Sequence, residues 1–166
     1  DITFKEGEQG QRVICQGKDV TERIREPEIG WMASAVSMKR PVRQAMVRLQ
    51  RKIGAKGKIV AEGRDTGTVV FPWAKYKFFL NAELGERAQR RHRELAAKGI
   101  STEMKKVEKE IRERDEQDSF REVAPLHPAA DARQIDSTGI PPEEVVERIL
   151  AIMEKVSSPP GSREDG

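Results

Sequence analysis

Apolar and polar residues alternate along 2–16, and a glycine-bearing segment at 7–10 interrupts this alternation. A period of two places every second side chain on the same face of a strand, so the pattern predicts a β-hairpin with its turn at 7–10. The segment that follows, Asp19–Glu22, has a capping-box pattern with aspartate in the serine or threonine place. A short helix is therefore expected to begin there.

Farther along the chain, apolar residues recur every three to four positions, as is typical of amphipathic helices. Pro27 and Pro41 lie in the first turns of two expected helices, and Gly99 ends a third. The expected helices cover 27–38, 41–53, 83–98 and 101–122, and a last one begins at about Pro141.

Three short runs predict strands instead. Residues 58–61 have the pattern of the end of a buried strand, 76–80 that of a second core strand, and 134–136 that of a short third strand. Because strands and helices alternate from 58 onward, we expect an α/β fold in which helices flank a parallel sheet.

Composition narrows the choice of partners. The chain has 166 residues, enough for one domain, and a net charge of +3, with arginines concentrated at 40–51, 87–93 and 112–121. This layout favours an anionic partner. The single cysteine excludes an internal disulfide and a cysteine-rich zinc site, and the two histidines form no metal-ligand set. With no visible signal peptide and no apolar run of membrane-spanning length, we expect a cytoplasmic protein.

The stretch Glu62–Pro72 places polar and charged residues between glycines at the expected carboxyl end of the strand at 58–61. Open α/β sheets bind ligands at such strand ends. Gly63 would allow the backbone a close approach, and Arg64 and Asp65 place a cation beside an anion. The stretch is a candidate site; the alternative is a glycine turn with a surface ion pair.

A second candidate lies on the helix expected at 101–122. Arg114, Asp118 and Arg121 are spaced i, i+4 and i+7 and so share one stripe. A carboxylate between two guanidiniums would keep the arginines ordered, and the set could hold a ribose hydroxyl and a phosphate. The alternative is a solvated helix face with weak ion pairs.

Arg87, Arg90 and Arg91 form a third cluster, on the helix expected at 83–98. With no acidic neighbour expected at matching spacing, these cations would repel one another unless an anion visits. A mobile helical flap over a triphosphate would satisfy this pattern, and so would a nucleic-acid backbone.

Two further features lie nearby in the sequence. Ser34 and Arg43 flank the break between the helices expected at 27–38 and 41–53, where each alone would be unremarkable. The segment Gly54–Lys58 has a glycine-lysine pair, but its glycine spacing and its place before a strand exclude a phosphate-binding P-loop.

Taken together, these stretches resemble the bacterial-type cytidylate kinases of the nucleoside-monophosphate kinase group. The resemblance covers nearly all of residues 1–156, and the order and spacing of its blocks make it specific. The blocks are Asp19–Thr21, Ile24-Arg25, Glu28–Ser34, Pro41–Arg43, Gln50-Arg51, Glu62–Pro72, Lys77–Leu80, Arg87-Ala88, Arg90-Arg91, Arg114-Asp115, Asp118-Ser119, Arg121, Ala124–Leu126, Ala130–Ala132 and Ile135–Ser137.

The resemblance implies a fold and an activity: a P-loop kinase that transfers the γ-phosphate of ATP, with Mg²⁺, to CMP and to dCMP. It implies that Ser34, Arg43 and Asp65 bind cytosine. The chemistry agrees, because Asp65 can accept from the exocyclic amine of cytosine, while Ser34 and Arg43 can donate to its acceptors. Uracil has an acceptor in place of that amine, and a buried carboxylate left unpaired would cost about 1–3 kcal/mol or more.

The same resemblance implies that Arg64 and Arg121 hold the acceptor phosphate and that Arg114 and Asp118 contact the ribose. Arg90 and Arg91 match the family's mobile, arginine-rich lid, which closes over the ATP phosphates and would lie at about 87–100 in this chain. The residues implied to act on the transferring phosphate are Arg90, Arg91 and Arg121.

One departure from the family is large. The family begins with a strand, a P-loop and a helix, roughly 60 residues going by the family, and we expect them to precede Asp1. Without the P-loop there is no cradle for the β- and γ-phosphates and no hydroxyl for magnesium. We therefore expect this chain to be inactive as a kinase by itself, with the main ATP and Mg²⁺ site in the absent segment.

The expected organisation is a nucleotide-monophosphate-binding region at 1–57, the rest of the kinase core at 58–156 and a disordered tail at 157–166. We expect a monomer when complete, and no nucleic-acid or membrane partner. Two alternatives stay open: a basic nucleic-acid-binding module, and a non-catalytic relic that still binds CMP. Stabilisation by CMP more than by UMP favours the kinase, and stabilisation by RNA alone favours the first alternative.

Overall fold

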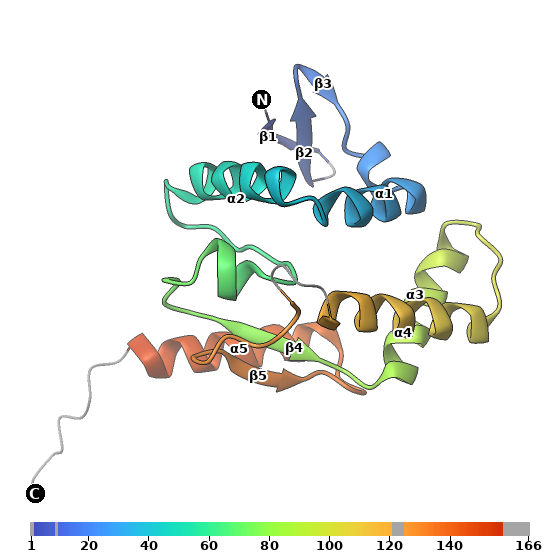
Figure 1. The fold of residues 1–166 in the computed structure, drawn as a ribbon. Helices are drawn as coiled ribbons and strands as arrows, with labels where there is room; N and C mark the ends of the chain where they lie inside the picture. Colours follow the sequence, from blue (N-terminus) through green and yellow to red (C-terminus); the bar gives the residue numbers. More distant parts are fainter. Residues whose placement is uncertain (1, 9, 121–124, 158–166) are drawn as a thin grey trace, which may run out of the picture. The chain divides into compact units, whose positions relative to one another are not determined.

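The computed structural model describes residues 2–8, 10–120 and 125–157 (Figure 1). The chain divides into two compact units, residues 1–53 and residues 54–166. The prediction of a disordered tail at 157–166 concerns positions that, apart from the backbone of Ser157, lie outside the described residues. Among the described residues, no helix is both long and apolar enough to cross a membrane.

The first unit begins with an antiparallel sheet of β1 (Ile2–Gly7), β2 (Gly10–Cys15) and β3 (Lys18–Asp19), in that order. The register pairs Ile2 with Cys15 and Gly7 with Gly10, so the predicted hairpin is confirmed. The alternation worked as a guide because the turn and the two strands are local in sequence.

Asp19 ends β3 and does not cap a helix, contrary to the prediction. Its Oδ1 accepts from the backbone nitrogen of Thr21 at 2.9 Å and from the Thr21 hydroxyl at 2.6 Å. This local turn uses the oxygen that a cap would need. A 3-10 turn, η1 (Arg23–Arg25), follows instead, and its N-cap residue is Glu22.

Two helices complete the first unit: α1 (Pro27–Ser37) and α2 (Arg40–Gly54), whose last residue reaches the second unit. Both were predicted. An apolar hollow of about 470 Å³ lies between residues of the sheet and η1 on one side and residues of α2 on the other. It is lined by Ile2, Phe4, Val13, Cys15, Val20, Ile24, Met46, Leu49, Gln50 and Ile53.

The second unit contains a π-helical turn η2 (Thr66–Val70), strands β4 (Phe78–Asn81) and β5 (Arg133–Asp136), and helices α3 (Leu84–Ala97), α4 (Met104–Phe120) and α5 (Pro142–Ser157). The strands are parallel, with Phe78 paired to Arg133 and Asn81 to Asp136. This is an α/β arrangement with a small parallel sheet, as the alternation of elements predicted.

The prediction of a strand at 58–61 is wrong. Residues 58–61 belong to no strand, and Val60 is fully exposed. An extended segment becomes a strand only if a neighbour accepts its backbone hydrogen bonds, and the described residues contain no such neighbour for it. The chain turns sharply just before, with positive φ angles at Gly57 (68°) and Lys58 (54°).

Helices α3 and α4 pack as a hairpin around Ala88, Leu95 and Val107, with Ile111 against them. Gly99 (φ 75°) ends α3 as predicted, because its left-handed backbone lets the nitrogen of Ile100 reach the carbonyl of Leu95 at 2.9 Å. The hairpin leads from the carboxyl end of β4 to the amino end of β5. Helix α3 begins soon after Asn81, so Arg87 lies near the carboxyl end of β4, where its Nε donates to the carbonyl of Ala82.

Candidate functional site

The glycine-rich stretch and helix α4 meet through one ion pair. The Nε of Arg64 lies 3.0 Å from Oδ2 of Asp118, whose side chain is 8% exposed. The backbone carbonyl of Asp118 also accepts from the nitrogen of Leu126 at 2.8 Å, which holds this end of α4 against the next segment. A guanidinium fixed by its Nε edge still has four N–H donors on its Nη atoms for an anion.

The segment around Asp65 is shaped by backbone hydrogen bonds. The nitrogens of Val69 and Val70 both donate to the carbonyl of Asp65, at 2.8 and 3.1 Å, which makes the wide turn η2. Gly63 has φ 154°, and a Cβ at this position would lie 2.6 Å from the Thr66 hydroxyl. Position 63 therefore requires glycine, which agrees with the close backbone approach predicted there. The turn leaves Asp65 half-buried beside Arg64.

Other predicted residues of the second unit lie on α4 or beyond it. Arg114 is exposed and lies one turn before Asp118. Arg121 lies outside the described residues, so its expected place on the same stripe stays a prediction. The structure thus brings Arg64, Asp65 and Asp118 into one neighbourhood, with Arg114 on the adjoining turn.

The first unit brings its two candidates together through Ser37. The Ser37 hydroxyl donates to the carbonyl of Ser34 at 2.7 Å, and Nη1 of Arg43 approaches the Ser37 carbonyl at 3.4 Å. Ser34 and Arg43 are both half-buried. The break between α1 and α2 therefore links the backbone of Ser34 to the guanidinium of Arg43 through Ser37, and a shared role of the two side chains stays a prediction.

The arginine cluster on α3 has acidic partners, contrary to the prediction that no acid lies at matching spacing. Arg87 contacts Asp115 of α4 at 2.5 Å and donates to the carbonyl of Ala82. Arg91 contacts Glu94 at 2.8 Å, within the same helix. The repulsion argument therefore fails, because the positive charges are partly compensated within the protein.

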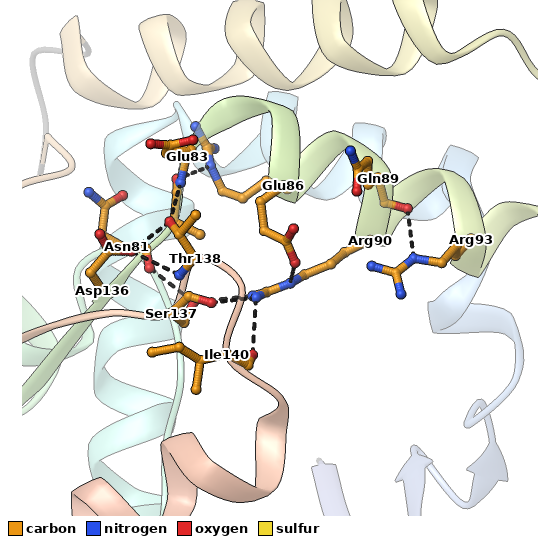
Figure 2. Close-up of polar contacts among 12 residues, drawn as sticks. Asn81, Glu83, Glu86, Gln89, Arg90, Arg93, Asp136, Ser137, Thr138 and Ile140 are labelled. Atoms are coloured by element: carbon orange, nitrogen blue, oxygen red, sulfur yellow. Dashed lines mark hydrogen bonds and ion pairs between the residues drawn. The ribbon is translucent and has the colours of Figure 1, made fainter.

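Arg90 is bound differently from its neighbours (Figure 2). Its Nε donates to Glu86 at 2.7 Å, while its Nη atoms donate to Ser137 and Ile140 in the turn after β5. The arginine cluster in the sequence did not indicate that Arg90 would bind the turn after β5. Glu86 lies one helical turn before Arg90, so that contact could be predicted from the sequence. The turn after β5 is distant in sequence, and no pattern indicated that Arg90 would contact it.

A buried lysine is another contact that the sequence did not reveal. Lys77, 7% exposed at its side chain, donates through Nζ to the carbonyl of Pro72 at 2.5 Å and to both carboxylate oxygens of Asp131, at 2.9 and 2.7 Å. This hydrogen bond lowers the pKa of Asp131. The only available signal was that both residues fall in blocks of the family resemblance. The stem of Lys77 also lies against Gly67.

The remaining perturbed carboxylates are held by local hydrogen bonds. The side-chain and backbone donors of Thr21, followed by Arg12, lower the pKa of Asp19 from 3.8 to about 2. Thr138 likewise lowers the pKa of Asp136, and Lys98 and then Arg91 lower that of Glu94. Within the described part of the chain, no three histidine, cysteine or acidic side chains are close enough to hold a metal ion.

The second unit therefore has an α/β arrangement with a small parallel sheet and with arginine–carboxylate pairs, Arg64 with Asp118 and Arg87 with Asp115. The chain matches the family described as cytidylate kinase over residues 1–155. It belongs to the cytidylate kinase family, as the resemblance predicted.

Three relatives named cytidylate kinase show the extent of this similarity. The protein of Geobacter sp. (strain M21) is 51% identical over 147 residues, 89% of this chain and 63% of the relative. That of Carboxydothermus hydrogenoformans is 48% identical, covering 92% of this chain and 69% of the relative. That of Enterococcus faecalis is 48% identical, covering 93% and 68%. The chain thus spans about two thirds of the length of these curated relatives, 63% to 69%.

Proposed function

We propose that the protein transfers the γ-phosphoryl group of ATP to CMP, giving CDP and ADP. The observation that carries this proposal is the contact between Arg64 and the buried Asp118, within a chain of the cytidylate kinase family. The pair places a guanidinium beside Asp65 and next to a helix with further arginines, which suits a phosphate close to a polar base.

Cytosine recognition rests on complementary donors and acceptors. Asp65 accepts from the exocyclic amine, and Ser34 and Arg43 donate to the ring nitrogen and the carbonyl oxygen. Support comes from the half-buried state of all three side chains. With UMP, the carboxylate of Asp65 would face an oxygen lone pair, and this repulsion provides the discrimination.

The remaining candidate residues of the second unit are proposed to bind the acceptor phosphate and the ribose. We assign Arg64 and Arg121 to the phosphate, and Arg114 and Asp118 to the ribose hydroxyls. Asp118 then has two tasks, since it both orders Arg64 and accepts from the sugar. CMP and dCMP differ only in the 2′-hydroxyl. If Asp118 accepts a hydrogen bond from that hydroxyl, Asp118→Asn should weaken the binding of CMP more than the binding of dCMP.

ATP is the proposed phosphoryl donor, with Arg91 on α3 and Arg121 stabilising the negative charge of the transferring group. The prediction that Arg90 also binds phosphate stays a prediction, and its contacts favour another role, argued below. The N-terminal region at 1–57 would then bind the monophosphate, and 58–156 would form the kinase core.

Nucleotide-induced stabilisation and turnover test the proposal. CMP should raise the melting temperature more than UMP, single-stranded RNA should not raise it, and the full-length protein should phosphorylate CMP in preference to UMP. Asp65→Ala should narrow the CMP-over-UMP ratio of kcat/KM, and Glu113→Ala, on an exposed face of α4, serves as the control. Stabilisation by RNA but not by CMP would support the nucleic-acid-binding alternative. CMP binding by a full-length protein that does not phosphorylate CMP would support the non-catalytic alternative.

A further inference from the structure

The turn after β5 is fixed to the parallel sheet. Ser137 is buried, and its backbone nitrogen and hydroxyl both donate to the carbonyl of Asn81, at 2.7 and 3.0 Å. Asn81 is the last residue of β4, so the loops that leave the two neighbouring parallel strands are joined here. In open α/β sheets this edge is where ligands bind.

Arg90 connects α3 to this turn. Its Nη1 donates to the Ser137 hydroxyl at 3.1 Å, and its Nη2 donates to the carbonyls of Ser137 and Ile140 at 2.5 and 3.4 Å. Its Nε donates to Glu86 on the preceding turn of α3, which fixes the plane of the guanidinium (Figure 2). One side chain therefore supplies hydrogen bonds to two backbone carbonyls immediately before α5.

A second contact holds the start of α3 to the same turn. The backbone nitrogen of Glu83 donates to the Thr138 hydroxyl at 2.9 Å, and that hydroxyl donates to Asp136 at 2.6 Å (Figure 2). The helix is thus attached to the turn after β5 at two places, its N-cap residue Glu83 and the helical turn that carries Arg90. These two attachment points, together with the packing of α3 against α4, fix the direction of the helix relative to the turn.

We propose that Arg90 is a positioning residue, which fixes α3 to the Ser137–Ile140 turn and so sets the direction in which Arg91 projects, and that it is not itself a phosphate ligand. The proposal rests on the phosphoryl-transfer function proposed above. Arg91 differs from Arg90 because its contact, with Glu94, lies within α3 and leaves it independent of the turn.

The geometry requires arginine rather than any cation. A guanidinium is a planar fork whose donors reach Glu86, Ser137 and Ile140 in three directions, whereas an ammonium on a lysine stem is a point donor. Arg90→Lys should therefore keep the charge and lose the connection. A phosphate ligand would tolerate the same change better, because lysine also binds phosphates.

The experiment compares Arg90→Ala, Arg90→Lys and Arg91→Ala in the full-length protein, because the 166-residue chain by itself is expected to be inactive as a kinase. Arg93→Ala is the matched control. Arg93 is an exposed arginine of the same helix, and its contact is with the carbonyl of Gln89 (Figure 2). Hydrogen exchange of the Thr138 and Ile140 amides reports the turn without nucleotide, because these nitrogens bond to Asp136 and Ser137.

Both Arg90 variants should speed the exchange of these amides and lower kcat by roughly tenfold to a hundredfold, with KM for ATP within about twofold. The Arg91→Ala variant should raise KM for ATP or lower kcat with exchange unchanged, and Arg93→Ala should change neither. Arg90→Ala and Glu86→Ala combined should cost little more kcat than Arg90→Ala alone, since both act through one contact.

Two results would overturn the inference. Unchanged exchange with a raised KM for ATP in the Arg90 variants would make Arg90 a phosphate ligand. Faster exchange with unchanged kcat would give it a purely structural role. Failure of the proposed function is a separate result, because it would appear as absent CMP turnover in the unaltered full-length protein, whereas the exchange measurement needs no activity.

Discussion

Arg64 and Asp118 lie in contact although they belong to a glycine-rich segment and to the end of a long helix. The distance from Nε to Oδ2 is 3.0 Å, with the arginine side chain 41% exposed and the aspartate 8% exposed. Because of this difference in exposure, loss of Arg64 and loss of Asp118 should not lower the free energy of unfolding equally. Loss of the arginine removes one partner from a poorly hydrated carboxylate, while loss of the carboxylate leaves a guanidinium that water can reach.

Arg64→Ala should therefore destabilise the protein more than Asp118→Ala, by about 1–3 kcal/mol against about 1 kcal/mol. Both changes should weaken CMP binding. Chemical denaturation and calorimetric titration with CMP measure the two effects. Arg112→Ala is the control, because Arg112 pairs with Glu108 on the exposed face of the same helix, and its loss should cost less than about 0.5 kcal/mol. Equal stability losses for the two partners would contradict the asymmetry.

Gly63→Ala should destabilise the protein by about 1–3 kcal/mol, because an alanine there adopts an unfavourable φ of 154° and its Cβ approaches the Thr66 hydroxyl. The change should also reduce the affinity for CMP by displacing Asp65. Gly85→Ala, in the first turn of α3, is the matched control. Nothing lies within 4 Å of its added methyl group, so it should be neutral or stabilising by up to about 1 kcal/mol. Denaturant midpoints check both variants, and a neutral Gly63→Ala would show that this segment rearranges freely.

Asp131→Ala should be more destabilising than Lys77→Met. The first change leaves a buried ammonium, 7% exposed, with the Pro72 carbonyl as its remaining contact, while the second leaves a carboxylate that is 65% exposed and readily hydrated. Methionine also keeps the stem that lies against Gly67. Thermal unfolding should show the larger loss for Asp131→Ala, and the reverse order would mean that Lys77 is solvated.

Stability should fall in acid partly through Asp19. Its pKa is lowered from 3.8 in the unfolded chain to about 2 in the folded protein, chiefly by Thr21, so the folded state favours the ionised carboxylate. A lowered folded pKa gives stability that is present above pH 3.8 and lost as the pH falls toward 2. Asp19→Asn should therefore lower the melting temperature at pH 6, and the difference should vanish near pH 2. Thr21→Val should reproduce the pH-dependent part of this loss and add a loss that persists at pH 2, because the Thr21 hydroxyl also accepts from the nitrogen of Val13 at 2.9 Å. For Asp19→Asn, a difference that persists at pH 2 would have another cause.

The sequence predicted the helices well because their signals are local. Pro27, Pro41 and Gly99 mark boundaries that the structure places within one or two residues of those expected. The strand at 58–61 failed for the opposite reason. An apolar run carries no information about whether a second strand lies beside it, and Val60 is exposed.

The candidate site shows the same division between local and distant information. The adjacency of Arg64 and Asp65 and the spacing of Arg114 and Asp118 were readable, but the contact between the two segments was not. The ion pairs of α3 were partly readable, since Glu94 follows Arg91 by three residues, whereas the attachment of Arg90 to Ser137 depends on how the chain folds back.

The pairing of β4 with β5 has a consequence for the order in which the chain assembles. Asn81 and Ser137 are 56 residues apart, and the intervening chain contains the hairpin of α3 and α4 around Ala88 and Val107. Closing so long a loop is entropically slow unless the helices shorten it first. Pulse-labelled amides of the hairpin should therefore become protected during refolding before those of β5, which makes the arginine-bearing helices the scaffold on which the sheet is completed.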